Sequence, residues 1–305
     1  MTSSRPAPPA PAGGSAPPPP AGSRSSATPR DARRAFDEPP WRVWTAPAAI
    51  GLGLAFGAVA SIVVAVVAQV GGSSVSHPSA AVNIIGNVLF DLAFVVAALY
   101  FVRLQGRPRA ADFGFRQTPL RLGGAVFLIG GVGYYVLTAL YAAILGLHGS
   151  ERLPTSLGVG RSTAADVAVV AFVCVIAPIA EEFFFRGFIF GALRRWRIQV
   201  GRRNIGTLLA GVVTAILFGL AHAGSASPKY LVPLALLGLI LCFVRWRTAS
   251  LYPCIALHSF NNCLAVGLNQ FHWNLAEIFA LMAGSLLVIG AATGPLSFRT
   301  DRAAS

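Results

Sequence analysis

From Trp41 onward, long apolar runs follow one another with few polar interruptions. A hydrocarbon core about 30 Å thick is crossed by about 20 consecutive apolar residues in a helix. By that measure the chain has eight candidate spans, of which the sixth and seventh are the least distinct. Their limits are 46–70, 82–102, 122–147, 165–193, 204–222, 230–244, 249–268 and 275–293. The pattern predicts an all-α, polytopic membrane protein with about eight transmembrane helices between residues 41 and 298.

The two ends of the chain have a different composition. Residues 1–40 are rich in Pro, Ala, Gly and Ser, include the run Pro17–Pro20, and contain few large apolar side chains. Such a segment cannot bury enough apolar surface to fold, so we expect a disordered tail. Residues 299–305 form a short C-terminal tail. The beginning of the chain also lacks the order of basic, apolar and small residues that is typical of a signal peptide.

Charge separates membrane insertion from nucleic-acid binding. Charged residues make up only 11% of the chain, although the net charge is +13. The basic residues lie in the connections between apolar runs and form no basic stripe, so we expect no nucleic-acid partner. If the N-terminus is inside, 20 of the 24 lysine and arginine residues lie on the cytoplasmic side. The positive-inside rule therefore predicts that both termini are cytoplasmic.

Two further compositional features bear on the compartment. The chain has 23 arginines, one lysine and abundant alanine, a bias of GC-rich genomes, and it carries no eukaryotic sorting signal. This favours a bacterial plasma membrane. The four cysteines lie in apolar stretches without CxxC spacing, so we expect small hydrophobic side chains and neither disulfides nor a zinc ribbon. They are Cys174, Cys242, Cys254 and Cys263.

Ionisable and amide side chains gather in three of the predicted spans. An ionisable group within a span costs roughly 2.5–3.5 kcal/mol on insertion, so it indicates a functional or packing role. The fourth span contains the sequence EEFFFR, the fifth ends in FGLAH and the seventh contains HSFNN. The candidate catalytic residues are Glu181, Glu182, Arg186, His222, His258 and Asn262.

Helical spacing predicts how these groups are presented. Glu182 and Arg186 are four residues apart and share a face, so they can form a partly desolvated ion pair. Glu181 lies about 100° around the same helix and is the better candidate for reactive chemistry. His258 and Asn262 also share a face. We therefore expect three helices to point a carboxylate, an imidazole, and an imidazole with an amide into one water-filled cavity.

Such a set of side chains is suited to hydrolysis. A carboxylate in apolar surroundings beside a second carboxylate can act as a general base near neutral pH. An imidazole and an amide can hold a water and donate hydrogen bonds to the oxyanion of a tetrahedral intermediate. The lipid bilayer is the surrounding partner.

The three motifs carry a family resemblance. EEFFFR matches EExxxR, FGLAH matches FxxxH and HSFNN matches HxxxN, in order and on successive spans. Over residues 165–268 the chain resembles the type II CAAX prenyl endopeptidase and bacteriocin-processing family of intramembrane proteases, and the eight-span plan is similar to that family's fold. The resemblance implies a protein or peptide substrate and roles for six residues. Glu181 would activate water with Glu182 and Arg186 as its partners, His222 would be a second water-side or metal-side group, and His258 with Asn262 would lie on the oxyanion side.

A metal site is an open alternative. Glu181, His222 and His258 offer three oxygen and nitrogen ligands and leave a position for water, as catalytic zinc sites do. The family is commonly labelled metalloprotease, while a metal-free glutamate mechanism has also been proposed for it. The chain has no HExxH pair, which favours the metal-free mechanism.

Other functions would use the same polar groups differently. The EExxxR cluster could be a structural ion pair between helices, and a non-catalytic scaffold or immunity-type partner would keep the fold and act by binding. A transporter would also place acids and histidines in the membrane, but the chain shows no convincing inverted repeat. The identity of the substrate, including whether it is prenylated, stays open.

Several remaining residues receive a structural interpretation. We expect Asp91, alone in the second span, to be a packed acid and not a catalytic one. Pro178 should free a backbone carbonyl and kink the fourth span. The histidines outside the motifs, His77, His148 and His272, are expected in solvated connections.

Overall fold

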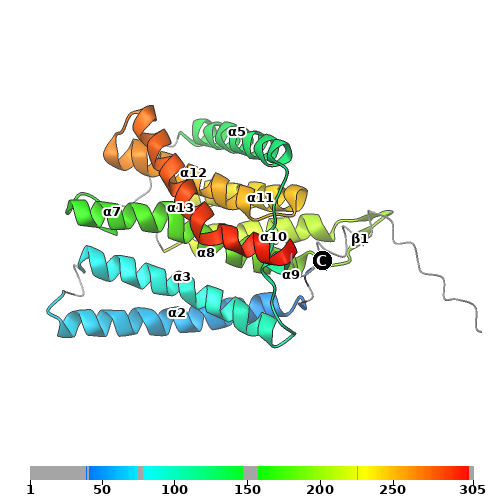
Figure 1. Ribbon diagram of the computed structural model, residues 1–305, viewed down its shortest axis with the longest axis horizontal. Coiled ribbons are helices and arrows are strands. Elements are labelled where there is room, and N and C mark those ends of the chain that lie inside the picture. The colour runs from blue at the N-terminus through cyan, green and yellow to red at the C-terminus, as the bar shows by residue number, and fades with distance from the viewer. Residues whose placement is uncertain (1–38, 40, 75–77, 147–156, 225, 302–305) are drawn as a thin grey trace, which may run out of the picture. The chain divides into compact units, whose positions relative to one another are not determined.

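The structure is a computed structural model that describes residue 39 and residues 41–74, 78–146, 157–224 and 226–301. Almost all of its regular structure is helical (Figure 1), which confirms the predicted all-α fold class. The predicted disordered tail, apart from residue 39, lies outside the described residues. So do the last four residues of the predicted C-terminal tail, His77 and His148.

Each predicted span coincides with a helix, although not every helix has the length of a span. The helices are α2 (Thr45–Val70), α3 (Ala80–Arg103), α5 (Leu120–Leu145), the composite α7 to α9 (Thr163–Leu193), α10 (Gly206–Ala221), α11 (Pro228–Thr248), α12 (Tyr252–Val266) and α13 (Leu275–Asp301). Among the described residues, six of them are long and apolar enough to cross a membrane. The exceptions are α10, which has 16 residues, about 24 Å at 1.5 Å per residue, and α12, which has 15 residues and contains the polar sequence HSFNN. The count of eight spans is therefore not confirmed.

The remaining elements are short connections. Helix α4 (Ala110–Phe113) lies between α3 and α5, and the π-helical segment η3 (Gly267–Phe271) continues α12. The strands β1 (Gln199–Val200) and β2 (Arg203–Asn204) form an antiparallel hairpin between α9 and α10. The turn passes through Gly201, whose φ of +58° is a left-handed conformation that glycine adopts without strain.

The composite helix α7 to α9 is the centre of the helical arrangement (Figure 1). Helices α2 and α3 form an antiparallel hairpin, and α3 packs against α7, α8 and the π-helical segments of the composite helix. Helix α12 packs against α8 from another side, while α10 pairs with α11 and α5 covers α11 and α12. The three segments that carry the sequence motifs are therefore neighbours in space.

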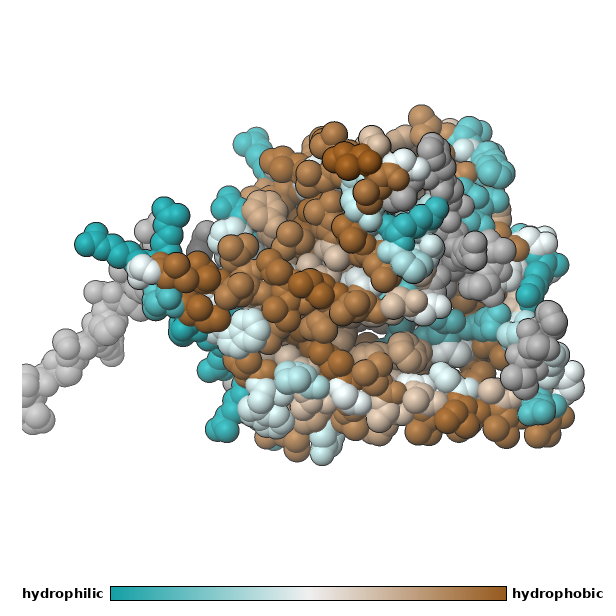
Figure 2. All heavy atoms as spheres, turned by 180° about the vertical axis from the view of Figure 1, so that it is seen from behind, coloured by the Kyte–Doolittle hydropathy of each residue, from teal (hydrophilic) through white to brown (hydrophobic). Residues whose placement is uncertain are grey.

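The outer surface is consistent with a lipid environment. Large apolar side chains are exposed along several helices, for example Val67 on α2, Leu128 on α5 and Leu287 on α13. Hydrophobic side chains cover the central part of the face in Figure 2, and hydrophilic ones gather mainly toward its ends. This belt is what a helix bundle surrounded by hydrocarbon requires, since lipid chains do not penalise exposed apolar groups.

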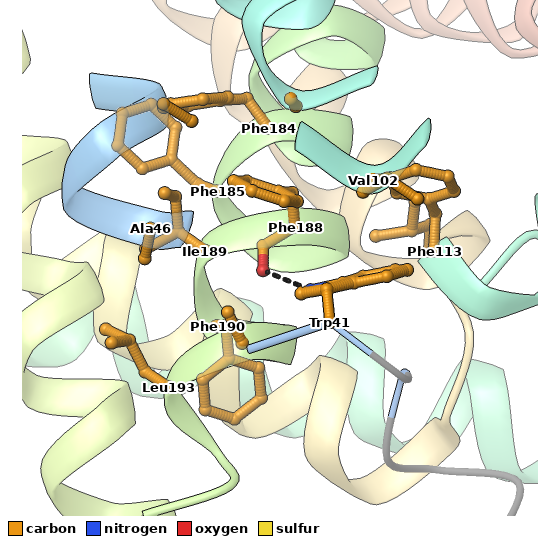
Figure 3. Close-up of a cluster of buried hydrophobic side chains, with 14 of the residues drawn as sticks. Trp41, Ala46, Val102, Phe113, Phe184, Phe185, Phe188, Ile189, Phe190 and Leu193 are labelled. Atoms are coloured by element: carbon orange, nitrogen blue, oxygen red, sulfur yellow. Dashed lines mark hydrogen bonds between the residues drawn. The ribbon is translucent and has the colours of Figure 1, made fainter. Parts of the chain in front are cut away.

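An aromatic cluster fixes the arginine-rich end of the composite helix (Figure 3). Trp41 is fully buried, its indole Nε1 donates to the Phe188 carbonyl oxygen at 3.3 Å, and its ring lies 4.9 Å from that of Phe113. Phe184 and Phe185 belong to the same core. The segment before α2 is thereby tied to the helix that carries the EExxxR motif.

The composite helix is interrupted beside that motif. The π-helical segments η1 (Phe172–Ile176) and η2 (Phe183–Ile189) flank the short helix α8 (Ala177–Glu182). Pro178 has no N–H to give to the carbonyl of Cys174, four residues earlier. Ser259 of α12 donates its hydroxyl to that carbonyl at 2.6 Å. The predicted free carbonyl is therefore present, and a neighbouring helix satisfies it.

Candidate active site

Four of the six motif residues line one large cavity. It has a volume of about 960 Å³ and is bounded by residues of α2, α3, α5, α10, α11, α12 and the composite helix. Glu181, His222, His258 and Asn262 are all part of its lining. Figure 2 shows a hollow with hydrophilic atoms between two hydrophobic layers of the bundle. The three helices thus converge on one cavity, as the sequence predicts.

Glu181 lies at the meeting point of the two histidines. Its carboxylate oxygen Oε2 is 3.8 Å from His222 Nε2 and 4.0 Å from His258 Nε2. The glutamate side chain is 18% exposed, yet Oε2 itself is buried and has no hydrogen-bond partner among the described residues. A buried carboxylate oxygen without a donor is costly, so this position is suited to a bound donor.

Glu182 connects two helices through a buried network. Its Oε1 accepts hydrogen bonds from Arg186 Nη1 and from His258 Nδ1, each at 2.8 Å. The side chains of Glu182 and Arg186 are fully buried, and that of His258 is 4% exposed. The predicted ion pair between Glu182 and Arg186 is present. Its bond to His258, 76 residues away in the chain, was not foreseen.

Arg186 is held by more than its ion pair. Its Nη2 donates to the carbonyl oxygen of Gly238 on α11 at 3.2 Å. Its guanidinium carbon lies 4.2 Å from the centre of the Phe218 ring on α10. A guanidinium over an aromatic face is stabilised by the ring quadrupole. Arg186 therefore links the composite helix to both α10 and α11, around the two candidate carboxylates.

Hydrogen bonds set the orientation of both imidazoles. His222 Nδ1 lies 2.8 Å from the Phe218 carbonyl oxygen, and His258 Nδ1 lies 2.8 Å from the Glu182 carboxylate. Both partners accept, so each Nδ1 carries a proton, and in the tautomer with one proton each ring has Nε2 as an acceptor. The two Nε2 atoms and Glu181 Oε2 are then three acceptors around one small space. A water molecule can donate to two of them.

The short length of α10 explains how His222 reaches the depth of Glu181. The sequence places His222 at the outer end of a full span, which is difficult to reconcile with a deeper glutamate. Helix α10 ends at residue 221 after 16 residues, about 24 Å, which is less than the hydrocarbon thickness. His222 follows as its C-terminal cap, and it therefore lies within the bundle.

Asn262 forms part of the connection between α12 and the composite helix. Its Nδ2 donates to the carbonyl oxygen of Val173 in η1 at 2.9 Å. Its Oδ1 accepts from Asn261 Nδ2 at 3.2 Å, and Asn261 Oδ1 accepts from the Tyr135 hydroxyl at 3.2 Å. Asn261 lines the cavity as well. Asn261 and Tyr135 were not among the predicted site residues, and only the doubled asparagine in HSFNN signals the former.

Helix α3 contributes a polar face of which sequence reasoning considered only Asp91, as a packed acid. Asn83, Asn87 and Asp91 all line the cavity, and Asp91 interacts electrostatically with Glu181. Asp91 Oδ2 is buried without a hydrogen-bond partner among the described residues. The spacing of four residues between Asn83, Asn87 and Asp91 was the sequence feature that could have revealed this polar face, since it places all three on one side of the helix. His272, by contrast, is exposed, as expected.

The predicted metal ligands have suitable chemistry but wide spacing. Tetrahedral zinc with bonds of about 2.0–2.2 Å holds its ligand atoms roughly 3.3–3.6 Å apart. The separations of 3.8 and 4.0 Å from Glu181 to the two histidines are larger. Within the part of the chain that the structure describes, no group of three His, Cys, Asp or Glu side chains is arranged to hold a metal ion. As placed, Glu181, His222 and His258 do not fit zinc.

Comparison with known proteins finds a family that matches the segment containing the motifs. Residues 163–264 match the family described as "Type II CAAX prenyl endopeptidase Rce1-like". This segment belongs to the Rce1-like family. It runs from α7 into α12 and contains all six candidate catalytic residues. The polar face of α3 lies outside the Rce1-like segment, so the match does not extend to it.

The relatives add little beyond the family. The chain is 28% identical over 143 residues to an uncharacterized 24.3 kDa protein of Escherichia coli. The alignment covers 46% of this chain and 61% of the E. coli protein, so the chain spans less than two thirds of that relative. No solved structure matches the chain.

Proposed function

We propose that the chain is an intramembrane endopeptidase that hydrolyses peptide bonds with a water activated by Glu181. The observation that carries the proposal is the convergence of His222 Nε2 and His258 Nε2 on one oxygen of Glu181 within a cavity between helices. The Rce1-like segment supports an endopeptidase, since that is the activity in the family's description. The substrate is a protein or peptide.

The first step is deprotonation of water. A water about 2.8 Å from both Glu181 Oε2 and a histidine Nε2 spans separations of 3.8–4.0 Å without strain. Glu181 takes one proton of this water as its oxygen attacks the carbonyl carbon of the scissile bond. The carbonyl π electrons move to oxygen and form a tetrahedral oxyanion. Glu181 then gives its proton to the leaving nitrogen, the C–N bond breaks, and the products are a carboxylic acid and an amine.

The other motif residues position and stabilise. Glu182, itself paired with Arg186, fixes the His258 ring so that Nε2 faces Glu181. Asn262 uses one N–H for Val173, and its second N–H can donate to the oxyanion. In this mechanism His258 and His222 hold the water, and Asn262 forms the oxyanion side.

The proposed setting is a bacterial plasma membrane with both termini in the cytoplasm. The arginine-rich connections support this orientation through the positive-inside rule. Residues near the other ends of the helices, such as Ser74, Asn83 and Gly224, line the cavity. The cavity is then reached from the extracytoplasmic side. Reporter fusions test this orientation. A reporter fused after residue 146 should give an external signal, and one fused at the C-terminus should give a cytoplasmic signal.

The decisive experiment is peptide cleavage by purified protein in nanodiscs, with a library of quenched fluorogenic peptides. Glu181→Gln should abolish cleavage, and His258→Ala should reduce kcat by at least about 100-fold, the usual contribution of acid–base and positioning groups. Glu277→Gln is the matched control, because Glu277 caps the start of α13 outside the cavity. A chelator should leave the rate unchanged if no metal takes part.

Other outcomes distinguish the alternatives. If Glu181→Gln cleaves as fast as the wild type, the activity belongs to a contaminant and the endopeptidase proposal fails. Inhibition by chelator with recovery on adding zinc would restore the metal mechanism, with Glu181, His222 and His258 as ligands after a small closure. Unchanged function of Glu181→Gln in cells would favour the non-catalytic scaffold or a transporter.

A further inference from the structure

The catalytic cavity has a polar wall that the hydrolytic mechanism does not use. Asn83, Asn87 and Asp91 lie on one face of α3 at intervals of four residues, and each lines the cavity. The helix is otherwise strongly apolar, and Ile85, on another face, is 52% exposed. Polar groups in a membrane-spanning helix are costly unless they have partners or a function. This face therefore requires an explanation beyond packing.

The deeper two residues present hydrogen-bond acceptors. Asn87 Nδ2 donates to the Asn83 carbonyl on its own helix at 2.8 Å, so the amide oxygen is the side-chain group left for other partners. Asp91 Oδ2 is buried and has no partner among the described residues. Asp91 is also close enough to Glu181 to interact with it electrostatically. Two acceptors thus lie in line, one of them beside the catalytic carboxylate.

Their spacing fits an extended polypeptide. Residues four apart on a helix are separated by about 6.0 Å along its axis. In an extended chain, N–H groups on the same edge recur every second residue, at about 6.6 Å. Asp91 and Asn87 can therefore accept from the N–H groups of residues n and n+2, with a mismatch of only about 0.6 Å. Asn83 lies four residues before Asn87 on the same face. It is therefore closer to the end of α3 that lies away from the arginine-rich connections.

We propose that the face of α3 formed by Asn83, Asn87 and Asp91 binds the substrate backbone as an extended strand that enters from the arginine-poor end of the bundle. The inference rests on the proposed function for the identity of the ligand. Asp91 binds the N–H nearest the scissile bond, and Asn87 binds the N–H two residues away. From Asp91 to Asn83 the face is about 12 Å long, which corresponds to about four residues of extended peptide.

A backbone scan tests this register. Decapeptides that the wild-type protein cleaves in nanodiscs are resynthesised with one amide at a time replaced by an ester, which removes a single N–H. We expect two sensitive positions, two residues apart on one side of the scissile bond, each with a three- to tenfold loss of kcat/KM, the range for one hydrogen bond. The position between them should lose less than twofold.

Variants assign each sensitive position to a side chain. In Asn87→Leu, the ester substitution two residues from the inner sensitive amide should no longer lower kcat/KM, while the one nearest the scissile bond still does. In Asp91→Leu, the substitution nearest the scissile bond should lose its effect, while the other keeps it. Ile85→Leu is the control on the same helix and should keep both penalties. Penalties that are absent, that fall on consecutive residues, or that persist unchanged in both variants would overturn the proposal.

A second measurement covers the case in which these variants fold poorly or turnover is too slow. The photo-crosslinker p-benzoylphenylalanine replaces Val82, which lines the cavity, or Ile85, which does not. A fluorescent decapeptide from the same library should crosslink at position 82 at least tenfold more than at position 85. Equal crosslinking at both positions contradicts the proposal. Selective crosslinking in a protein that cleaves nothing supports the binding face and counts against the proposed function alone.

Discussion

Replacing Glu182 by leucine should destabilise the protein strongly, because the carboxylate neutralises a fully buried arginine. Glu182 Oε1 lies 2.8 Å from Arg186 Nη1, and neither side chain is exposed. Breaking a buried ion pair by removing one partner costs about 3–5 kcal/mol, since it leaves an uncompensated charge. We expect a loss of this size in the free energy of unfolding for Glu182→Leu, and a similar loss for Arg186→Met.

The double variant Glu182→Leu/Arg186→Met should be more stable than either single variant. A buried ion pair can often be replaced by apolar residues of similar volume at little cost. The remaining penalty is the unpaired His258 Nδ1, which lost its acceptor and costs about 1–3 kcal/mol. The double variant should therefore lie within about 3 kcal/mol of the wild type. It should be inactive, because the carboxylate that holds the His258 ring through Nδ1 is then absent.

The assay is SDS-induced unfolding of the protein in detergent micelles, followed by circular dichroism, with cleavage measured on the same preparations. The free energies of the four proteins form a double-mutant cycle. Additive losses of about 6–10 kcal/mol in the double variant would refute the reasoning, since they would mean that the two side chains contribute independently. An active double variant would refute the positioning role of Glu182.

Three further changes test packing. Gly219→Ala places a Cβ 2.8 Å from the Leu231 carbonyl oxygen and should lower the free energy of unfolding by about 1–3 kcal/mol. A Cβ at Gly133 would have no atom within 4 Å, so Gly133→Ala should change the free energy of unfolding by less than about 1 kcal/mol. Trp41→Phe removes the buried bond to the Phe188 carbonyl and should cost about 1–2 kcal/mol in the same titration. All four cysteines are buried, so a water-soluble maleimide should modify none in the folded protein and all four in SDS, as counted by mass spectrometry.

The positions of the helices were accessible from the sequence because apolar run length is a direct physical requirement of a bilayer. Each predicted span coincides with a helix, and the i, i+4 rule gave the ion pair of Glu182 with Arg186. The number of spans was less accessible. Helix α10 is apolar throughout, and hydropathy alone does not show that it ends at residue 221, inside the bundle.

Contacts between helices were not accessible from one sequence. The bond of Glu182 to His258 joins residues 76 positions apart, and it depends on how α12 docks against α8. Asp91 was expected to be a packed acid, because a lone carboxylate in a span carries no motif. Its place in the cavity follows from the packing of α3 on α8, although the spacing of Asn83, Asn87 and Asp91 was visible beforehand.

Proline explains why these helices dock where they do. Pro178 cannot donate to the carbonyl of Cys174, four residues earlier, and Ser259 of α12 donates there instead. In α11, Pro233 cannot donate to the carbonyl of Lys229, and the Tyr141 hydroxyl of α5 lies 3.2 Å from it. A carbonyl without a partner in a bilayer costs several kcal/mol, so each proline creates a fixed acceptor for a neighbouring helix.

The acceptor at Cys174 also sets the geometry of the candidate catalytic groups. Ser259, which donates to the Cys174 carbonyl, directly follows His258 in α12. Asn262 Nδ2 donates to the adjacent carbonyl, that of Val173. Two side chains of α12 are thus anchored to η1, about two turns before Glu181 and Glu182 on the same composite helix. Anchoring α12 at these points fixes its height and rotation, which brings the His258 ring to Glu182 and directs its Nε2 toward Glu181. The break in the helix that sequence identifies as a kink is therefore the feature that assembles the site.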